Sequence, residues 1–211
     1  MNALTSPVAA AALQIDYADP SQLPVLLADP QVMAIFGFQA GDEPVASADP
    51  RYLQVGLQPD GQAQLEVWRS DKPVSSGRDA NGVAWASDGA LMFGALQVDE
   101  HQHGGIIGAS EHAYARMLEA LPAHAYPHLL RIWNYLDAIT DGEDDSERYR
   151  EFCVGRARGI GAIDTSTLPA GRHLLHTDGL ALRNGVRLAG QDVEFVVVVS
   201  NAPIPEGLAL H

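Results

Sequence analysis

The segment that decides the fold covers residues 128–139 and reads HLLRIWNYLDAI. Apolar and polar side chains alternate along it, which is the period of a β-strand. One face would hold Asn134 among aliphatic neighbours, so its amide is expected to be buried and hydrogen-bonded. The residues of that face are Leu130, Ile132, Asn134 and Leu136. The opposite face could line a pocket or form an exposed interface, and it holds Leu129, Arg131, Trp133 and Tyr135.

A helix is predicted next, over residues 144–163, and it contains the run ERYREFCVGRAR at 147–158. At about 100° per residue, Arg148, Tyr149, Phe152 and Arg156 fall within about one third of the helix circumference. An ordinary core-facing stripe is apolar, so two arginines beside two aromatic rings suggest a face that binds carboxylates. The same pattern also fits buried arginines paired with local carboxylates. Gly155 lies on this face and would allow another backbone to approach closely.

The rest of the chain supplies the other elements of an α+β fold. Strands are predicted at 13–17, 52–57 and 65–69, a hairpin at 82–86 and 91–98, and a short helix at 29–35. A helix over 109–121 carries one apolar stripe of Tyr114, Met117, Leu118 and Leu121. The order predicts a mixed sheet with helices on one face. Asn184-Gly185 indicates a further hairpin. The strand at 193–200 is expected to form an unpaired apolar edge that promotes self-association.

Composition limits the class of partner. The 211 residues include 13 basic and 27 acidic side chains, a net charge of −14, which disfavours nucleic acid and anionic membranes. No apolar run is long enough to span a bilayer and no signal peptide is evident, so a cytoplasmic protein is expected. The single cysteine, Cys153, excludes a disulfide within the chain and is interpreted as a buried small residue.

The eight histidines raise the question of a metal site. His101 and His103 are close in sequence, but no third ligand follows at a recognisable spacing. We therefore expect no metal. The glycines at 104, 105 and 108 precede a helix, but their spacing is not that of a phosphate-binding loop.

Residues 128–139 and 147–158 together resemble the chorismatase family, and within it the 3-hydroxybenzoate synthase type. Weaker likeness lies at 26–30, 36–38 and 49–53. The similarity covers roughly residues 1–168, which is taken as an N-terminal domain. Residues 169–211 are taken as a divergent tail, or as the start of a truncated second domain.

The resemblance implies a RidA-like (YjgF) fold that assembles as a trimer, and release of pyruvate from chorismate to give 3-hydroxybenzoate. It implies no cofactor, and a role in pigment or quinone synthesis. The family's proton donor belongs to the second domain, so no catalytic acid is assigned in this chain. The residues that match the shared motifs, and that the resemblance places at a substrate site, are Arg148, Tyr149, Arg156, Trp133 and Asn134.

The sequence leaves three functional interpretations open. The first is a shortened enzyme of the chorismatase family, with its activity impaired by the truncation. The second is a non-catalytic RidA-like module for binding or assembly, or a decayed fragment. The third, a RidA-like deaminase that acts on imines, has no specific motif in its favour.

Overall fold

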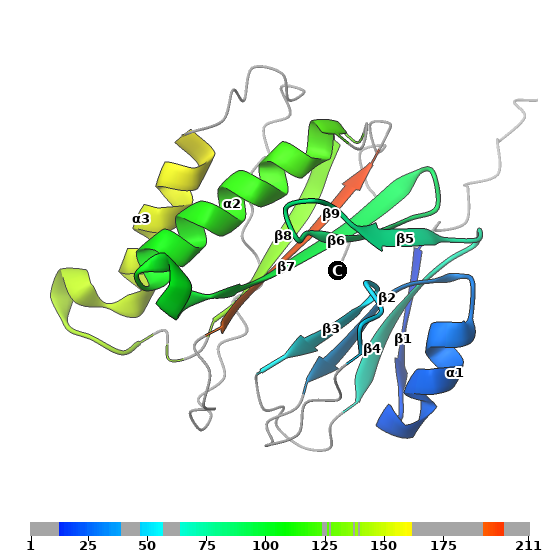
Figure 1. Ribbon diagram of the computed structural model, residues 1–211. Coiled ribbons are helices and arrows are strands. Elements are labelled where there is room, and N and C mark those ends of the chain that lie inside the picture. Colours follow the sequence, from blue (N-terminus) through cyan, green and yellow to red (C-terminus); the bar gives the residue numbers. More distant parts are fainter. Residues whose placement is uncertain are drawn as a thin grey trace, which may run out of the picture.

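The computed structural model describes residues 13–38, 47–56, 64–123, 126, 128–136, 138, 140–161 and 192–200. Two β-sheets pack against each other, and helices cover the outer face of each (Figure 1). The layer between the sheets is an apolar core that includes Phe36 and Trp68 from one sheet and Phe93 from the other. The predicted α+β class, with helices on one face of a sheet, is confirmed.

The first sheet has four strands in the order β1-β4-β2-β3. They are β1 (Leu13–Ala18), β2 (Val32–Phe38), β3 (Tyr52–Val55) and β4 (Leu65–Ser70). The β2–β3 pair is parallel and the other pairs are antiparallel. A short 3-10 helix, η1 (Pro20–Gln22), leads into α1 (Leu23–Ala28), which buries Leu23 and Leu26 against the outer face of this sheet.

The second sheet has five strands in the order β5-β6-β7-β9-β8, and every neighbouring pair is antiparallel. They are β5 (Ser75–Arg78), β6 (Ala84–Ser87), β7 (Leu91–Asp99), β8 (His128–Tyr135) and β9 (Asp192–Ser200). The helices α2 (Ile106–Ala123) and α3 (Arg148–Gly161) lie side by side on its outer face (Figure 1). The short 3-10 helices η2 (Glu100–His103) and η3 (Asp144–Ser146) precede them.

Two predictions were wrong, one about a helix and one about strand pairing. The helix expected at 29–35 is absent, because residues 32–38 form β2, which is buried almost throughout. A continuous apolar run of this length fits a buried strand as well as a helix, and here β3 and β4 pair with it on both sides. A single mixed sheet was also expected, whereas there are two sheets, of which the four-stranded one is mixed and the five-stranded one is antiparallel.

A bulge in β8 changes the predicted alternation at its start. The register shifts between Leu129 and Arg131, and an extra residue in one strand reverses the faces that follow. As a result Leu129 packs with Ile132 on the helix side, whereas Leu130 packs with Trp133 between the sheets. The faces predicted for the side chains after the bulge are correct, and those predicted for Leu129 and Leu130 are interchanged.

The last described strand occupies an unexpected place. β9 lies inside the sheet, with β7 on one side and β8 on the other. The prediction of an unpaired apolar edge at 193–200 was therefore wrong, and its argument for self-association falls with it. The hairpin predicted at Asn184-Gly185 lies outside the described residues. The domain boundary at 168/169 stays a prediction.

Helices α2 and α3 approach each other closely at two glycines of α3. A Cβ atom placed on Gly155 would overlap the carbonyl of Ile107 and lie 2.8 Å from the Cβ of Ser110. A Cβ atom on Gly159 would lie 2.8 Å from the Cβ of Tyr114. The absence of side chains at these two positions therefore sets the distance between the helices, as predicted for Gly155.

Replacing Gly155 by alanine is expected to lower the free energy of unfolding by about 1–3 kcal/mol, because the new methyl group must push α2 and α3 apart. Urea denaturation measures the effect. The matched control is Gly161→Ala at the end of the same helix, where a Cβ atom meets nothing within 4 Å. The control is expected to stay within about 0.5 kcal/mol of the parent protein. Equal stability of the two variants would contradict the tight helix contact.

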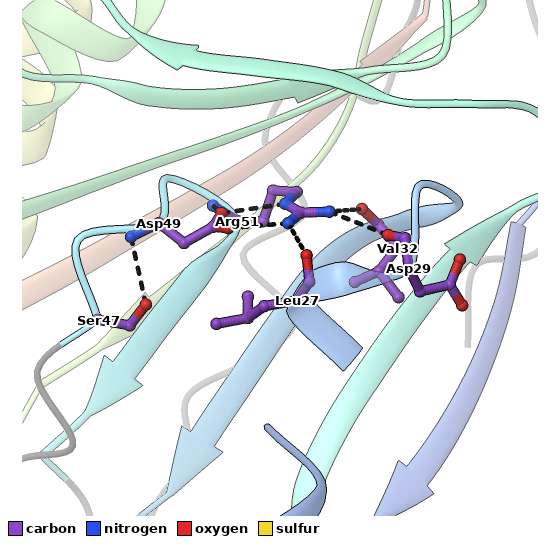
Figure 2. Close-up of polar contacts among 6 residues, drawn as sticks. All are labelled: Leu27, Asp29, Val32, Ser47, Asp49 and Arg51. Carbon is purple, nitrogen blue, oxygen red and sulfur yellow. Dashed lines mark hydrogen bonds and ion pairs between the residues drawn. The ribbon is translucent and has the colours of Figure 1, made fainter. Parts of the chain in front are cut away.

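A single arginine joins the end of α1 to β2 and β3 (Figure 2). The Arg51 guanidinium donates five hydrogen bonds, and its side chain is only 11% exposed. Two go to the Asp49 carboxylate, at 3.0 and 2.8 Å. The others go to the carbonyls of Leu27, Asp29 (3.1 Å) and Val32 (3.4 Å). Arg51 thus binds carbonyls of α1, of the residue that follows it and of β2, and its hydrogen bonds lower the pKa of Asp49.

Candidate functional site

The predicted face of α3 is present and centres on Phe152, which is 1% exposed. The ring of Tyr149 stacks on Phe152 with centroids 6.2 Å apart and an interplanar angle of 24°. The guanidinium carbon of Arg156 lies 5.8 Å from the centroid of the same phenyl ring. Arg150 and Arg158 are exposed on the other side of the helix, as expected. Tyr149 and Arg156 therefore flank one buried aromatic ring, and both are partly accessible to solvent.

Arg148 occupies the beginning of α3 and has a different environment. Its guanidinium pairs with both carboxylate oxygens of Glu100: Nη1 lies 2.9 Å from Oε2, and Nη2 contacts Oε1. The Glu100 side chain is 2% exposed and the Arg148 side chain is 14% exposed. For Arg148 the structure therefore fits the second reading of the sequence pattern, a buried arginine paired with a carboxylate. The pair ties η2, at the end of β7, to α3.

Asn134 is buried beneath the helices, as predicted, with 3% of its surface exposed. The Tyr114 hydroxyl of α2 donates a hydrogen bond of 3.1 Å to its Oδ1. Arg156 also acts on this hydroxyl, through its charge and a hydrogen bond. Burial raises the pKa of Tyr114 to about 12. Asn134 and Arg156 are therefore connected through the hydroxyl of a third residue.

Trp133 lies on the opposite side of β8 from Asn134. Its ring packs edge-on against Trp68 of the other sheet, with centroids 5.2 Å apart. The Arg131 guanidinium lies over it, 5.0 Å from the ring centroid. The strand thus separates Trp133 from the other four predicted site residues.

Cys153 is half-buried and packs against the core beneath α2 and α3, which agrees with its interpretation as a small core residue. Its thiol lies beside Tyr149 and, together with burial, raises the pKa of that phenol.

The histidines form a pair that the sequence did not indicate. His103 packs against His112 of α2 in a tilted arrangement, with ring centroids 4.2 Å apart and an interplanar angle of 33°. Burial and the neighbouring His103 lower the pKa of His112. Within the described part of the chain, no three histidine, cysteine or acidic side chains are grouped to hold a metal ion.

Sequence reasoning missed two residues of this region, Glu100 and Tyr114. The helical spacing of Tyr114 correctly predicted its burial, but it gave no indication of a partner on β8. Glu100 precedes His101 and His103, and the local pattern raised the question of histidine ligands rather than indicating an acidic partner for Arg148. In both cases the partner belongs to a different element of the fold.

This face of α3 carries groups of the kinds that bind carboxylates and aromatic rings. It combines a guanidinium, a partly exposed phenol and an aromatic wall on one helix face, and guanidinium groups recognise carboxylates by bidentate hydrogen bonds.

The described helices include none that is long and apolar enough to cross a membrane.

Comparison with known proteins shows the family to which the chain belongs. The family described as "Chorismatase FkbO/Hyg5-like, N-terminal" matches residues 66–180, which is more than half of the chain. A chorismatase from Streptomyces hygroscopicus is 36% identical over 176 residues, covering 78% of this chain and 50% of that protein. A chorismatase from Streptomyces rapamycinicus is 34% identical over 148 residues, covering 67% of this chain and 43% of that protein.

One further relative and one solved structure are also similar to the chain. A 3-hydroxybenzoate synthase from Streptomyces hygroscopicus is 34% identical over 100 residues, covering 47% of this chain and 28% of that protein. A crystal structure of a chorismatase superposes with a TM-score of 0.67 at 29% identity, covering 92% of this chain and 55% of that one.

Fold and sequence together define an α+β protein of the chorismatase type. The chain belongs to the FkbO/Hyg5-like chorismatase family, as its resemblance predicted. It spans about half the length of the curated relatives it matches.

Proposed function

We propose that this chain acts in the cleavage of chorismate, releasing pyruvate and leaving 3-hydroxybenzoate. Two relatives are named chorismatases and a third is named a 3-hydroxybenzoate synthase. The segment that matches the family, residues 66–180, contains β8, α3 and all five residues predicted for the substrate site.

The proposed reaction sets simple chemical demands. Chorismate carries two carboxylates and an enol ether, and pyruvate plus 3-hydroxybenzoate contain the same atoms as chorismate. No oxidant, reductant or co-reactant therefore enters the balance. An acid must protonate the methylene carbon of the enol ether, and cationic donors must bind the carboxylates.

The observation that carries the proposal is the placement of Tyr149 and Arg156 around Phe152 on α3. In the proposed complex Arg156 binds a substrate carboxylate, and Tyr149 contacts the ring. Arg148, already paired with Glu100, fixes the start of the helix. Asn134 acts through Tyr114, and Trp133 lies outside the contact because it faces the other sheet.

We also propose that the helix-backed sheet is RidA-like (YjgF-like) and that the protein forms a homo-oligomer, with a trimer as the expected state. The five-stranded sheet with two helices on one face supports the first part. Residues 1–168 would form the N-terminal domain, with 169–211 as a tail or the start of a second domain. Light scattering of the purified protein tests the oligomeric state.

The experiment is incubation of the purified 211-residue protein with chorismate. Pyruvate is measured through lactate dehydrogenase and NADH, and the aromatic product by chromatography. The proposal predicts equal amounts of pyruvate and 3-hydroxybenzoate. Pyruvate with a different ring product would contradict the 3-hydroxybenzoate assignment. Chorismate binding without pyruvate release would contradict catalysis and favour the non-catalytic binding module.

Arg156→Gln is expected to lower kcat/KM by roughly 10- to 100-fold, because a hydrogen bond to a charged group contributes about 1.5–3 kcal/mol. The matched control is Arg158→Gln on the same helix, whose side chain is 59% exposed and lies 3.9 Å from Glu111. The control should retain the parent kcat/KM. Equal effects of the two substitutions would exclude Arg156 from the site.

A further inference from the structure

The Tyr114 hydroxyl is the point where α2, β8 and α3 meet through polar groups. Tyr114 is 1% exposed, and its hydroxyl lies 3.1 Å from Asn134 Oδ1 of β8. From α3, Arg156 acts on the same hydroxyl through a hydrogen bond and through its charge. The two residues on either side of Tyr114, Asn134 and Arg156, both belong to the family motifs.

The direction of this short hydrogen-bond chain follows from the chemistry of its members. A guanidinium only donates, and an amide oxygen only accepts. A phenol can do both at once if it keeps its proton, and burial raises the pKa of Tyr114 to about 12, so the phenol is neutral near neutral pH. The chain therefore runs from Arg156, through the Tyr114 hydroxyl, to Asn134.

The Arg156 guanidinium is thereby held from two sides. The Phe152 ring lies beside it, with the guanidinium carbon 5.8 Å from the ring centroid. The Tyr114 hydroxyl takes one of its five N–H donors. Phe152 and Tyr114 are themselves in contact, with ring centroids 6.3 Å apart, and both are almost fully buried. A rigid support of this kind orients a long side chain that would otherwise sample many rotamers.

We propose that Tyr114 is a positioning residue that orients Arg156 toward a substrate carboxylate, and that Asn134 completes the support by accepting from the Tyr114 hydroxyl. The identity of the ligand rests on the proposed function, whereas the orientation of Arg156 does not. Tyr114 acts through Arg156 and has no contact of its own with the substrate in this proposal.

Tyr114→Phe tests the proposal because it removes one oxygen and keeps the ring. The first readout is the set of guanidinium N–H signals of Arg156 in nitrogen-15 NMR, assigned with Arg156→Lys. Exchange of the bonded N–H with water is expected to become about tenfold faster when the hydroxyl is removed. The second readout is kinetic: KM for chorismate should rise about tenfold, with kcat within about twofold, because binding in ground and transition states is lost alike.

The matched control is Tyr126→Phe. Tyr126 is also buried, and its hydroxyl shares a hydrogen bond with Ser87. This substitution also removes a phenol hydrogen bond, so its effect on stability is expected to be similar, while the Arg156 signal and KM stay at parent values. If Tyr114→Phe does not fold, Asn134→Ala is used, and it should shift the Arg156 signal in the same direction by a smaller amount.

The outcomes separate this inference from the proposed function. An unchanged Arg156 signal and KM in folded Tyr114→Phe would overturn the positioning role and leave the proposed function intact. A rise in KM in Tyr126→Phe as large as in Tyr114→Phe would overturn it as well, because the effect would then follow stability alone. If the parent protein neither binds nor cleaves chorismate, the proposed function fails, and the Arg156 signal still decides the orientation.

Discussion

Replacing Arg51 by alanine is expected to lower the free energy of unfolding by about 3–5 kcal/mol, because it breaks a largely buried ion pair and removes hydrogen bonds to three backbone carbonyls. The guanidinium pairs with Asp49 and with the carbonyls of Leu27, Asp29 and Val32. The substitution therefore removes the hydrogen bonds that join α1, β2 and the segment before β3. Urea unfolding followed by tryptophan fluorescence measures the change, since Trp68 lies between the two sheets.

Two further variants test whether the loss of stability is specific to the Arg51 guanidinium. Arg51→Lys keeps the charge but lacks the planar fork, so it should recover only part of the lost stability. Arg158→Ala removes an exposed arginine with a weak 3.9 Å ion pair and should change the free energy of unfolding by less than about 1 kcal/mol. An Arg51→Ala protein as stable as Arg158→Ala would contradict the anchoring role of Arg51.

Glu100→Gln is expected to have an effect of similar size, about 3–5 kcal/mol, because it removes the negative charge from a largely buried ion pair with the Arg148 guanidinium. The carboxylate is 2% exposed and contacts Arg148 through both oxygens. The loss should appear in urea unfolding at neutral pH.

A double-mutant cycle with Arg148→Met separates the pair from its surroundings. If the two charges compensate each other, the double variant Glu100→Gln/Arg148→Met should be more stable than the sum of the single losses predicts. Strictly additive losses would show that Glu100 and Arg148 contribute independently, contrary to the buried pair.

Elements with a clear period were predictable from the sequence, and elements defined by their neighbours were not. The alternation of β8 and the stripe of Tyr114, Met117 and Leu118 each reflect one buried face, and both are present. β2 is buried almost throughout, so it carries no period that distinguishes strand from helix. The position of β9 between β7 and β8 depends on pairing with distant residues, which local sequence does not encode.

The same distinction applies to the candidate site. Helical geometry predicted that Tyr149 and Arg156 share a face with Phe152, and they do. It could not reveal that Glu100 neutralises Arg148, because the two are 48 residues apart in sequence. The pleat of β8 placed Asn134 and Trp133 on opposite sides, so adjacent residues of one motif ended in different layers.

The release of pyruvate from chorismate by the purified protein is the measurement that tests the central proposal most directly. With protein in molar excess over chorismate, a single turnover suffices for detection, so slow catalysis is not missed. Pyruvate and 3-hydroxybenzoate are expected to appear together in a one-to-one ratio and at the same rate. Recovery of intact chorismate from folded protein, at the rate of its spontaneous decay, would contradict it.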